Sequence, residues 1–365
     1  MHGRQVRLGI FCVALVLASL GYVFAGTRLY QNYHAAYATY QLETGRCGAL
    51  ITWSPPSLLF TGLYVNQPQL LTLRYRAPAP ERLRITVGIP QLTQDQTIEV
   101  MAGATLQDQS FKPALIDDHV LDGLVTAGQR MGAIHLRVEA GGAAVCDTTS
   151  PVTLLSRQWM HWYDAATGTD YSPYLAGWVT PHSAAITDLV GRVARWMASH
   201  PASYAGTLGL VGYSGQSGQR DVVNQVDAIF DTLQSVYHVY YAQDNVPFSQ
   251  DATQRIKLPD DVLSSPYPAA MCVETTAIMA SAVEALGMKP YFIIVPGHAF
   301  LGVALGPGSD APFGYWETSD LNGGIDGNQA LVHGDAEYTS YQAQGKVLRV
   351  IDVAQVRAQG IEPIE

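Results

Sequence analysis

The chain has 365 residues, of which 48% are hydrophobic and only 14% are charged, and its formal net charge is −10. This composition is typical of packed cores and excludes a disordered chain, and the length leaves room for two domains and a tether. The acidic balance, together with the lack of any basic cluster in the sequence, argues against nucleic acid as a partner.

The N-terminal segment begins with two basic residues, Arg4 and Arg7, which precede an uncharged apolar run at residues 8–25. The run is long enough for one transmembrane helix, and the basic residues predict that everything after it is extracytoplasmic. An uncleaved anchor in the cytoplasmic membrane is the favoured interpretation. Cleavage of a signal peptide near Ala25, which would release a secreted protein, is the alternative. We expect residues 1–44 to form this membrane anchor and a stalk helix.

Residues 45–158 alternate apolar and polar side chains over short runs such as Leu83–Ile89, and the runs end at Pro-rich or Gly-rich breaks. This period of two predicts an antiparallel β-sandwich domain. Cys47 and Cys146 lie near its two ends, and we expect a disulfide between them in an oxidising compartment, with two free buried thiols as the alternative. The pairing leaves Cys272 as the odd cysteine of the exported part, which suits a reactive thiol.

Residues 159–365 form the third predicted region. The segment 159–173 is aromatic and polar without a period and is interpreted as a linker. Apolar residues at helical spacing predict a helix over 183–199 and a second helix that includes 222–233. Between them, residues 206–218 are Gly-rich and predict a loop. We expect both helices to pack on a catalytic core.

A cysteine opens the next predicted helix. The apolar residues that follow mark one buried helical face, and Gly287 and Pro290 predict its end. Cys272 therefore falls in or just before the first turn. There, unpaired N–H groups and the positive end of the helix dipole favour the thiolate, which is the nucleophilic form. A buried cysteine with no reactivity is the alternative.

A histidine and an acid follow on predicted strands. Tyr291–Val295 is a run of aromatic and β-branched residues that predicts a strand, a Pro-Gly pair interrupts it, and His298 begins the next strand. Glu317 closes a third strand and could accept a hydrogen bond from the imidazole, which would fix its tautomer; Asp320 is the rival acid. The order suits a nucleophile, its acid/base partner and an orienting acid.

These residues resemble the transglutaminase-like branch of the papain-like cysteine enzymes, and in particular its bacterial extracytoplasmic members. Those enzymes carry a cysteine at a helix start, a Gly-His-Ala segment on a strand, and an acid near a Trp on the following strand. Cys272, Gly297–Ala299 and Trp316–Thr318 match this order and spacing, and Ile256–Leu263 and Val350–Val353 also resemble such members. The family more often has Asp at the third position, so Glu317 departs from its pattern.

The resemblance covers about residues 170–365 and implies a papain- or transglutaminase-like α+β catalytic domain over 159–365. It also implies an oxyanion hole, to which the Cys272 backbone N–H would contribute and for which Gln254 and Tyr241 are candidate second donors. No C-x-x-C or H-E-x-x-H spacing links Cys272 and His298 to other ligands, so we expect neither a metal nor another cofactor.

The predicted function is thiol-dependent acyl transfer outside the cytoplasm with a Cys272-His298-Glu317 triad. Peptidase-like hydrolysis of an amide is the leading reaction, and transfer to an amine is the other outcome. The expected substrate is a protein, a peptide or a cell-envelope polymer, and the expected membrane contact is through residues 8–25. The alternative is a catalytically inactive envelope protein that uses the same fold for binding or as a scaffold.

Overall fold

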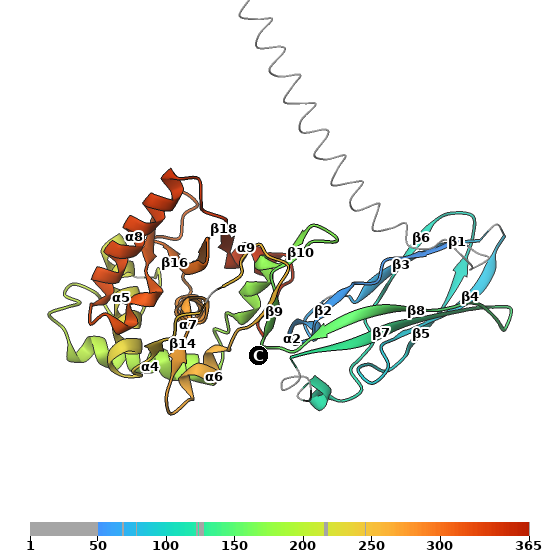
Figure 1. Cartoon of the computed structure of the whole chain (residues 1–365), viewed down its shortest axis with the longest axis horizontal. Helices are drawn as coiled ribbons and strands as arrows, with labels where there is room; N and C mark the ends of the chain where they lie inside the picture. Colours follow the sequence, from blue (N-terminus) through green and yellow to red (C-terminus); the bar gives the residue numbers. More distant parts are fainter. Residues whose placement is uncertain are drawn as a thin grey trace, which may run out of the picture. The chain divides into compact units, whose positions relative to one another are not determined.

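The computed structural model describes residues 50–67, 69–77, 79–121, 123, 128–214, 218–244 and 246–364. The chain divides into two compact units. The first contains the residues up to Ser57, Gln69–Asp117 and Gly132–Val152, and the second contains Leu58–Pro68, Asp118–Met131 and Thr153–Glu365. Helices and strands are both present and the sheets are mixed, so the fold class is α+β (Figure 1).

The first unit consists of antiparallel strands in two sheets (Figure 1). Its strands are β1 (Leu50–Trp53), β3 (Leu71–Arg76), β4 (Glu81–Gly88), β5 (Gln96–Ala102), β6 (Gln107–Phe111), β7 (Gln129–Ala140) and β8 (Ala143–Leu155). One sheet has the order β1-β3-β6, and the other contains β8-β7-β4-β5. Along β4, Leu83, Ile85 and Val87 are buried while Arg82 and Arg84 are exposed, so the alternation in the sequence marks the face that packs in the core.

Cys146 lies on β8 and is disulfide-bonded. Its predicted partner, Cys47, lies outside the described residues, so the Cys47–Cys146 pairing stays a prediction. Cys272 is a free thiol in the second unit. The disulfide and the candidate nucleophile therefore lie in different units.

The second unit is organised around a four-stranded antiparallel sheet of order β17-β16-β15-β18. These strands are β17 (Phe313–Trp316), β16 (His298–Ala304), β15 (Pro290–Val295) and β18 (Arg349–Asp352). Alternate residues of β15 face two different cores. Phe292 and Ile294 belong to a large core shared with α7 (Cys272–Ala285), whereas Ile293 and Val295 pack with Tyr338 and Tyr341 of α8 (Gly327–Ala343). The sheet is thus covered on both faces.

Helices α4 (Ala184–Ser199) and α5 (Gln219–Ser235) pack with α7 in that large core, and Figure 1 shows α7 end-on in the middle of the unit. Ser183 is the N-cap of α4 and accepts a hydrogen bond from the Ile186 backbone N–H, a common way to begin a helix. The remaining elements are α2 (Thr61–Tyr64), α6 (Pro259–Leu263), α9 (Val353–Ala358), the 3₁₀ helices η1 (Asp118–Leu121), η2 (Ser172–Trp178) and η3 (Thr318–Asn322), and the short strands β2 (Leu58–Phe60), β9 (Trp159–His161), β10 (Tyr163–Asp164), β11 (Thr169–Asp170), β12 (Tyr240–Tyr241), β13 (Thr253–Arg255) and β14 (Ala269–Ala270).

The fold class predicted from the sequence needs one correction, because it included an N-terminal membrane helix. Residues 8–25 and the whole predicted anchor and stalk, 1–44, lie outside the described residues. Within the described ranges, no helix has both the length and the apolar character needed to cross a bilayer. The supported class is therefore α+β with mixed sheets, without the predicted transmembrane element.

The units also divide the chain differently from the predicted segments 45–158 and 159–365. The late boundary lies at Val152 and Thr153, near the predicted one, but Leu58–Pro68 and Asp118–Met131 belong to the second unit. Strand pairing explains why Leu58–Pro68 belongs to the second unit, because β2 in this segment runs parallel to residues 153–155 at the end of β8.

Candidate active site

Cys272 is the first residue of α7, and only 1% of its surface is exposed. The sequence predicts one buried face for this helix, but all residues from Cys272 to Val283 are buried. A helix that is covered on all sides sits inside the core, and its many Ala, Thr and Ser residues make this burial compatible with close packing. The first turn of α7 is therefore held rigidly.

A buried acid fixes the start of α7. Glu274 accepts a hydrogen bond from the Met271 backbone N–H at 3.0 Å and another from the Lys257 backbone N–H at 2.7 Å. The Lys257 ammonium lies 3.3 Å from the same carboxyl group. An acid in the first turn complements the helix dipole, and this one also ties the segment before α6 to the residue that precedes Cys272.

His298 is placed by a tight hairpin. Val295 of β15 pairs with His298 of β16 across the two-residue turn Pro296–Gly297. Gly297 has a φ of 75°, which an L side chain rarely adopts, and Pro followed by Gly is the preferred pair for such a turn. His298 is thus the first residue after the turn, next to the start of α7.

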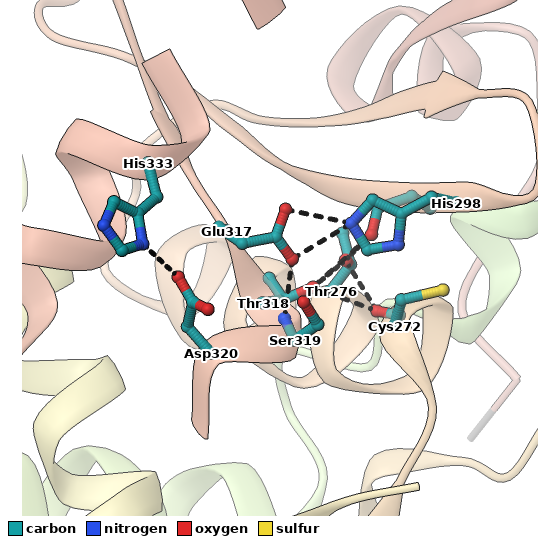
Figure 2. A network of polar contacts seen from close by, with 9 residues as sticks. Cys272, Thr276, His298, Glu317, Thr318, Ser319, Asp320 and His333 are labelled. Atoms are coloured by element: carbon teal, nitrogen blue, oxygen red, sulfur yellow. Dashed lines mark hydrogen bonds and ion pairs between the residues drawn. The ribbon is translucent and has the colours of Figure 1, made fainter. Parts of the chain in front are cut away.

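Glu317 contacts the imidazole directly (Figure 2). The His298 Nε2 lies 3.0 Å from Oε1 and 2.9 Å from Oε2 of Glu317, whose Oε1 also accepts the Ser319 backbone N–H at 2.8 Å. The rival acid, Asp320, instead lies 2.7 Å from Nδ1 of His333. Of the two acids considered from the sequence, Glu317 is therefore the one that orients His298.

The second nitrogen of His298, Nδ1, faces Cys272 (Figure 2). Burial lowers the pKa of His298, but hydrogen bonds to Cys272 and Glu317 and the negative charges of both outweigh it, so the pKa rises to about 10. Burial raises the pKa of Glu317, yet hydrogen bonds from His298, Glu337 and Ser319 and the imidazolium charge lower it to about 2. At neutral pH the site therefore holds an imidazolium between a carboxylate and the thiol group.

Two buried threonines join the elements that carry the site. Thr276 Oγ1 donates to the Cys272 carbonyl at 2.8 Å and lies 3.1 Å from Thr318 Oγ1. Thr318 Oγ1 lies 3.3 Å from the Cys272 carbonyl and 3.4 Å from that of Ala299, the residue after His298. These contacts link α7, β16 and η3, and Figure 2 shows them beneath the imidazole and the Glu317 carboxylate.

Both candidate oxyanion donors lie near the thiol. The Gln254 Oε1 accepts the Trp162 indole N–H at 3.3 Å, and its Nε2 lies 3.4 Å from the sulfur of Met271, the residue before Cys272. An amide nitrogen carries two hydrogens, so the same group can also donate to an oxyanion. Burial, followed by the charges of Cys272, Glu317 and Glu337, raises the pKa of Tyr241 to about 12, so its hydroxyl remains a donor.

Three side chains of the site could also act as metal ligands. His298, Glu317 and Glu337 each offer a ligand atom, and these atoms lie within 4.8 Å of one another. However, both oxygens of Glu317 already lie at hydrogen-bond distance from Nε2, which places the donor between them. Direct hydrogen bonds account for this geometry, and a bound cation would have to displace them.

Sequence reasoning named Cys272, His298 and Glu317, and the structure brings the three together. Sequence reasoning did not single out Thr276, Glu274 or Glu337, and it named Thr318 only as the end of the matched Trp316–Thr318 segment. Glu274, two residues after the cysteine, had the signal of an acid in a first helical turn. No protein-family model and no curated protein matches the chain. The geometry therefore carries the functional argument by itself.

Proposed function

We propose that this chain is an extracytoplasmic thiol-dependent amide hydrolase or acyl transferase related to the transglutaminase-like enzymes, with peptidase-like hydrolysis as its leading reaction. The observation that carries this proposal is the position of His298, which bonds Glu317 through Nε2 while its other ring nitrogen faces the Cys272 side chain (Figure 2). This is the arrangement that a thiol nucleophile, its proton donor and an orienting acid require.

The proposed reaction has two steps. The Cys272 thiolate attacks an amide carbonyl carbon, the His298 imidazolium gives its proton to the departing nitrogen, and the C–N bond breaks to leave a thioester. The neutral imidazole then takes a proton from water, whose oxygen attacks the thioester carbon, and the C–S bond breaks to release a carboxylic acid and restore the Cys272 thiolate beside the His298 imidazolium. With an amine in place of water, the product is a new amide.

Within each step, the charge that develops on the carbonyl oxygen needs donors. We assign these donors to the backbone N–H of Cys272, the Gln254 amide, which lies beside Met271, and the Tyr241 hydroxyl, which stays protonated. The substrate is a protein, a peptide or an envelope polymer with an amide bond. The choice between water and amine depends on the acceptor that reaches the thioester.

The test is alkylation of the full chain with iodoacetamide at about pH 6, with the site of modification read by mass spectrometry. We expect Cys272 to react, and His298→Ala to slow the reaction by about 10²-fold, since the imidazolium stabilises the thiolate. His333→Ala is the matched control, because His333 also bonds a carboxylate but lies away from the thiol. Equal rates in wild type and His298→Ala would contradict the proposal.

A catalytically inactive binding or scaffold protein is the second candidate, and the 1% exposure of Cys272 is the observation that favours it. A permanently covered thiol would resist alkylation at every pH at which the protein stays folded, both in wild type and in His298→Ala. If alkylation succeeds, incubation with peptide and glutamine-containing substrates, followed by mass analysis, distinguishes hydrolysis from amine transfer. Cys272→Ala serves as the blank in both measurements.

A further inference from the structure

Helix α8 lies unusually close to the end of β17. Ala330 and Gly334 lie against the end of the strand and Glu337 follows them, at intervals of four and three that place all three on one side of the helix, whereas Gly327 packs against Asp227 of α5. A Cβ at Gly334 would lie 2.3 Å from the Tyr315 carbonyl oxygen and 2.8 Å from the Glu317 backbone nitrogen. Only glycine permits this approach.

Two hydrogen bonds fix the register of α8 on β17. The Glu317 backbone N–H donates to the Ala330 carbonyl at 3.0 Å, and the Tyr315 backbone N–H donates to Asp335 at 3.0 Å. Glu337 follows Gly334 by one helical turn on the same side of the helix. The close approach therefore brings a carboxyl oxygen of the half-buried Glu337 within 4.8 Å of one of Glu317 and of a ring nitrogen of His298.

Two carboxyl groups in contact share a hydrogen bond only when one of them keeps its proton. Glu317 is the one that ionises, because it accepts hydrogen bonds from His298 and from the Ser319 backbone N–H. Glu337 has no such cationic partner at hydrogen-bond distance in the described structure. The proton therefore resides on Glu337, which donates to Glu317.

We propose that Glu337 is a positioning residue of the candidate active site, a neutral carboxylic acid that donates a hydrogen bond to the Glu317 carboxylate and so holds it against His298. This inference rests on the proposed thiol chemistry for its consequence in catalysis, but the protonated Glu337 can be tested without it. Glu337 acts through Glu317 and does not touch the reacting atoms.

The charged and titratable groups that face Glu337 from the neighbouring elements are Glu317, His298, Asp320 and Tyr241. Burial raises the pKa of Glu337 first, and the Glu317 hydrogen bond and charge and the Asp320 charge add to this, while the His298 charge opposes it; the result is about 8. On α8 itself, His333 lies one turn before Glu337 and bonds Asp320.

The sign of the pH effect follows from this. The ordinary pKa of a glutamate side chain is 4.5, and the pKa of Glu337 in the folded protein is about 8. The neutral Glu337 carboxyl therefore stabilises the folded protein fully below about pH 4.5, and this stabilisation is lost as the pH rises through about 8. Above that pH, two adjacent carboxylates repel and Glu317 loses its support. A glutamine at position 337 keeps the donor at every pH and removes this loss.

The experiment compares thermal unfolding of wild type, Glu337→Gln and Glu337→Ala between about pH 5 and pH 9, with the exposed Glu81→Gln as the charge control. We expect both Glu337→Gln and Glu337→Ala to gain stability relative to wild type as the pH rises, because both remove the carboxyl group that ionises, and Glu81→Gln to show no such gain. Glu337→Ala should be less stable than Glu337→Gln at every pH, because only the glutamine keeps the donor. A difference between Glu337→Gln and wild type that does not change with pH would overturn the proposal.

Alkylation of Cys272 gives the second readout. At about pH 6 we expect Glu337→Gln to react like wild type and Glu337→Ala to react about tenfold more slowly, since one hydrogen bond to a charged group is lost. Full reactivity of Glu337→Ala would overturn the positioning role. If instead the thiol is inert in every variant while the unfolding data keep their pH dependence, the proposed function fails and the protonated Glu337 stands.

Discussion

His298 illustrates how opposing effects are resolved at a single residue. Burial disfavours an imidazolium, yet two hydrogen-bonded neighbours that can carry negative charge outweigh it and raise the pKa to about 10. Glu317 shows the opposite case: burial alone would raise its pKa and favour the neutral acid, but its hydrogen bonds and the imidazolium charge keep it ionised. Each group is charged because the other is, so removing one charge should change the protonation of its partner.

Glu317→Gln tests this coupling. The amide keeps the size of the side chain but removes the negative charge, so the pKa of His298 should fall and the imidazolium that supports the thiolate should be lost. We expect Cys272 alkylation at about pH 6 to slow by about 10-fold to 10²-fold, no more than in His298→Ala, because Glu317 acts through the imidazole. The ionisation of His298 itself can be followed by NMR titration of its ring protons.

Asp320→Asn is the matched control for that change, because Asp320 was the rival acid and lies only three residues away. Its carboxylate bonds His333, whose ring is half-exposed, and not His298. We expect the alkylation rate of Asp320→Asn to stay within about threefold of wild type. A large loss in Asp320→Asn and none in Glu317→Gln would exchange the roles assigned to the two acids.

At the scale of elements, the sequence predicts helices and strands best where their apolar residues recur on the face that packs in the core. The helices around 183–199 and 222–233 correspond to α4 and α5, and the strand at Tyr291–Val295 corresponds to β15. The region 159–173 was interpreted as a linker, but it contains β9, β10 and β11. These strands have two or three residues each, too few to show a period.

Helix α8 shows why part of the site could not be predicted. Its fully buried residues are only Gly327, Ala330 and Gly334, and its larger apolar residues that pack on the cores, Leu331, Tyr338 and Tyr341, are only partly buried, so the helix leaves no amphipathic signal. Without that signal, nothing in the sequence indicated that Glu337 would lie beside Glu317. Thr276 was likewise unremarkable in the sequence, and Thr318 was noted only as part of the matched Trp316–Thr318 segment, because the contact between the two threonines joins α7 and η3 and forms only on folding.

Gly334→Ala tests the close approach of α8 to β17. The added Cβ would meet backbone atoms of Tyr315 and Glu317, which cannot rotate away, so we expect a loss of about 2 kcal/mol in the free energy of unfolding. Gly191→Ala in α4 is the control, since its Cβ would meet only the end of the Arg195 side chain at 4.0 Å. That change should stabilise the protein by about 0.5–1 kcal/mol.

Gly334→Ala and Gly191→Ala also separate the effect of the Glu337 position on thiol reactivity from the effect on the free energy of unfolding. Because Gly334 sets the distance between Glu337 and Glu317, we expect Gly334→Ala to slow Cys272 alkylation under conditions in which the protein remains folded. Chemical denaturation supplies the free energies, and alkylation at about pH 6 supplies the rates. A stabilising Gly334→Ala would show that α8 and β17 have more room than the structure gives them.

At the scale of the whole molecule, the two units have different sources of stability. The first unit is a set of antiparallel strands with a disulfide at Cys146, whereas the second has a continuous core around α7 and, among the described residues, the free thiol of Cys272. A disulfide stabilises mainly by restricting the unfolded chain. Its loss should therefore affect the unit that carries Cys146 far more than the candidate active site.

Mild reduction tests this division on the full chain. We expect a reducing agent to lower the stability of the first unit by about 2–5 kcal/mol, visible in calorimetry as a shift of one transition, because removing a native disulfide typically costs that much. The rate of Cys272 alkylation at about pH 6, measured after the reductant is removed and compared with Cys146→Ser, should stay unchanged. If reduction instead abolished the reactivity of Cys272, the disulfide would be supporting the site, and the two units could not be treated as independent.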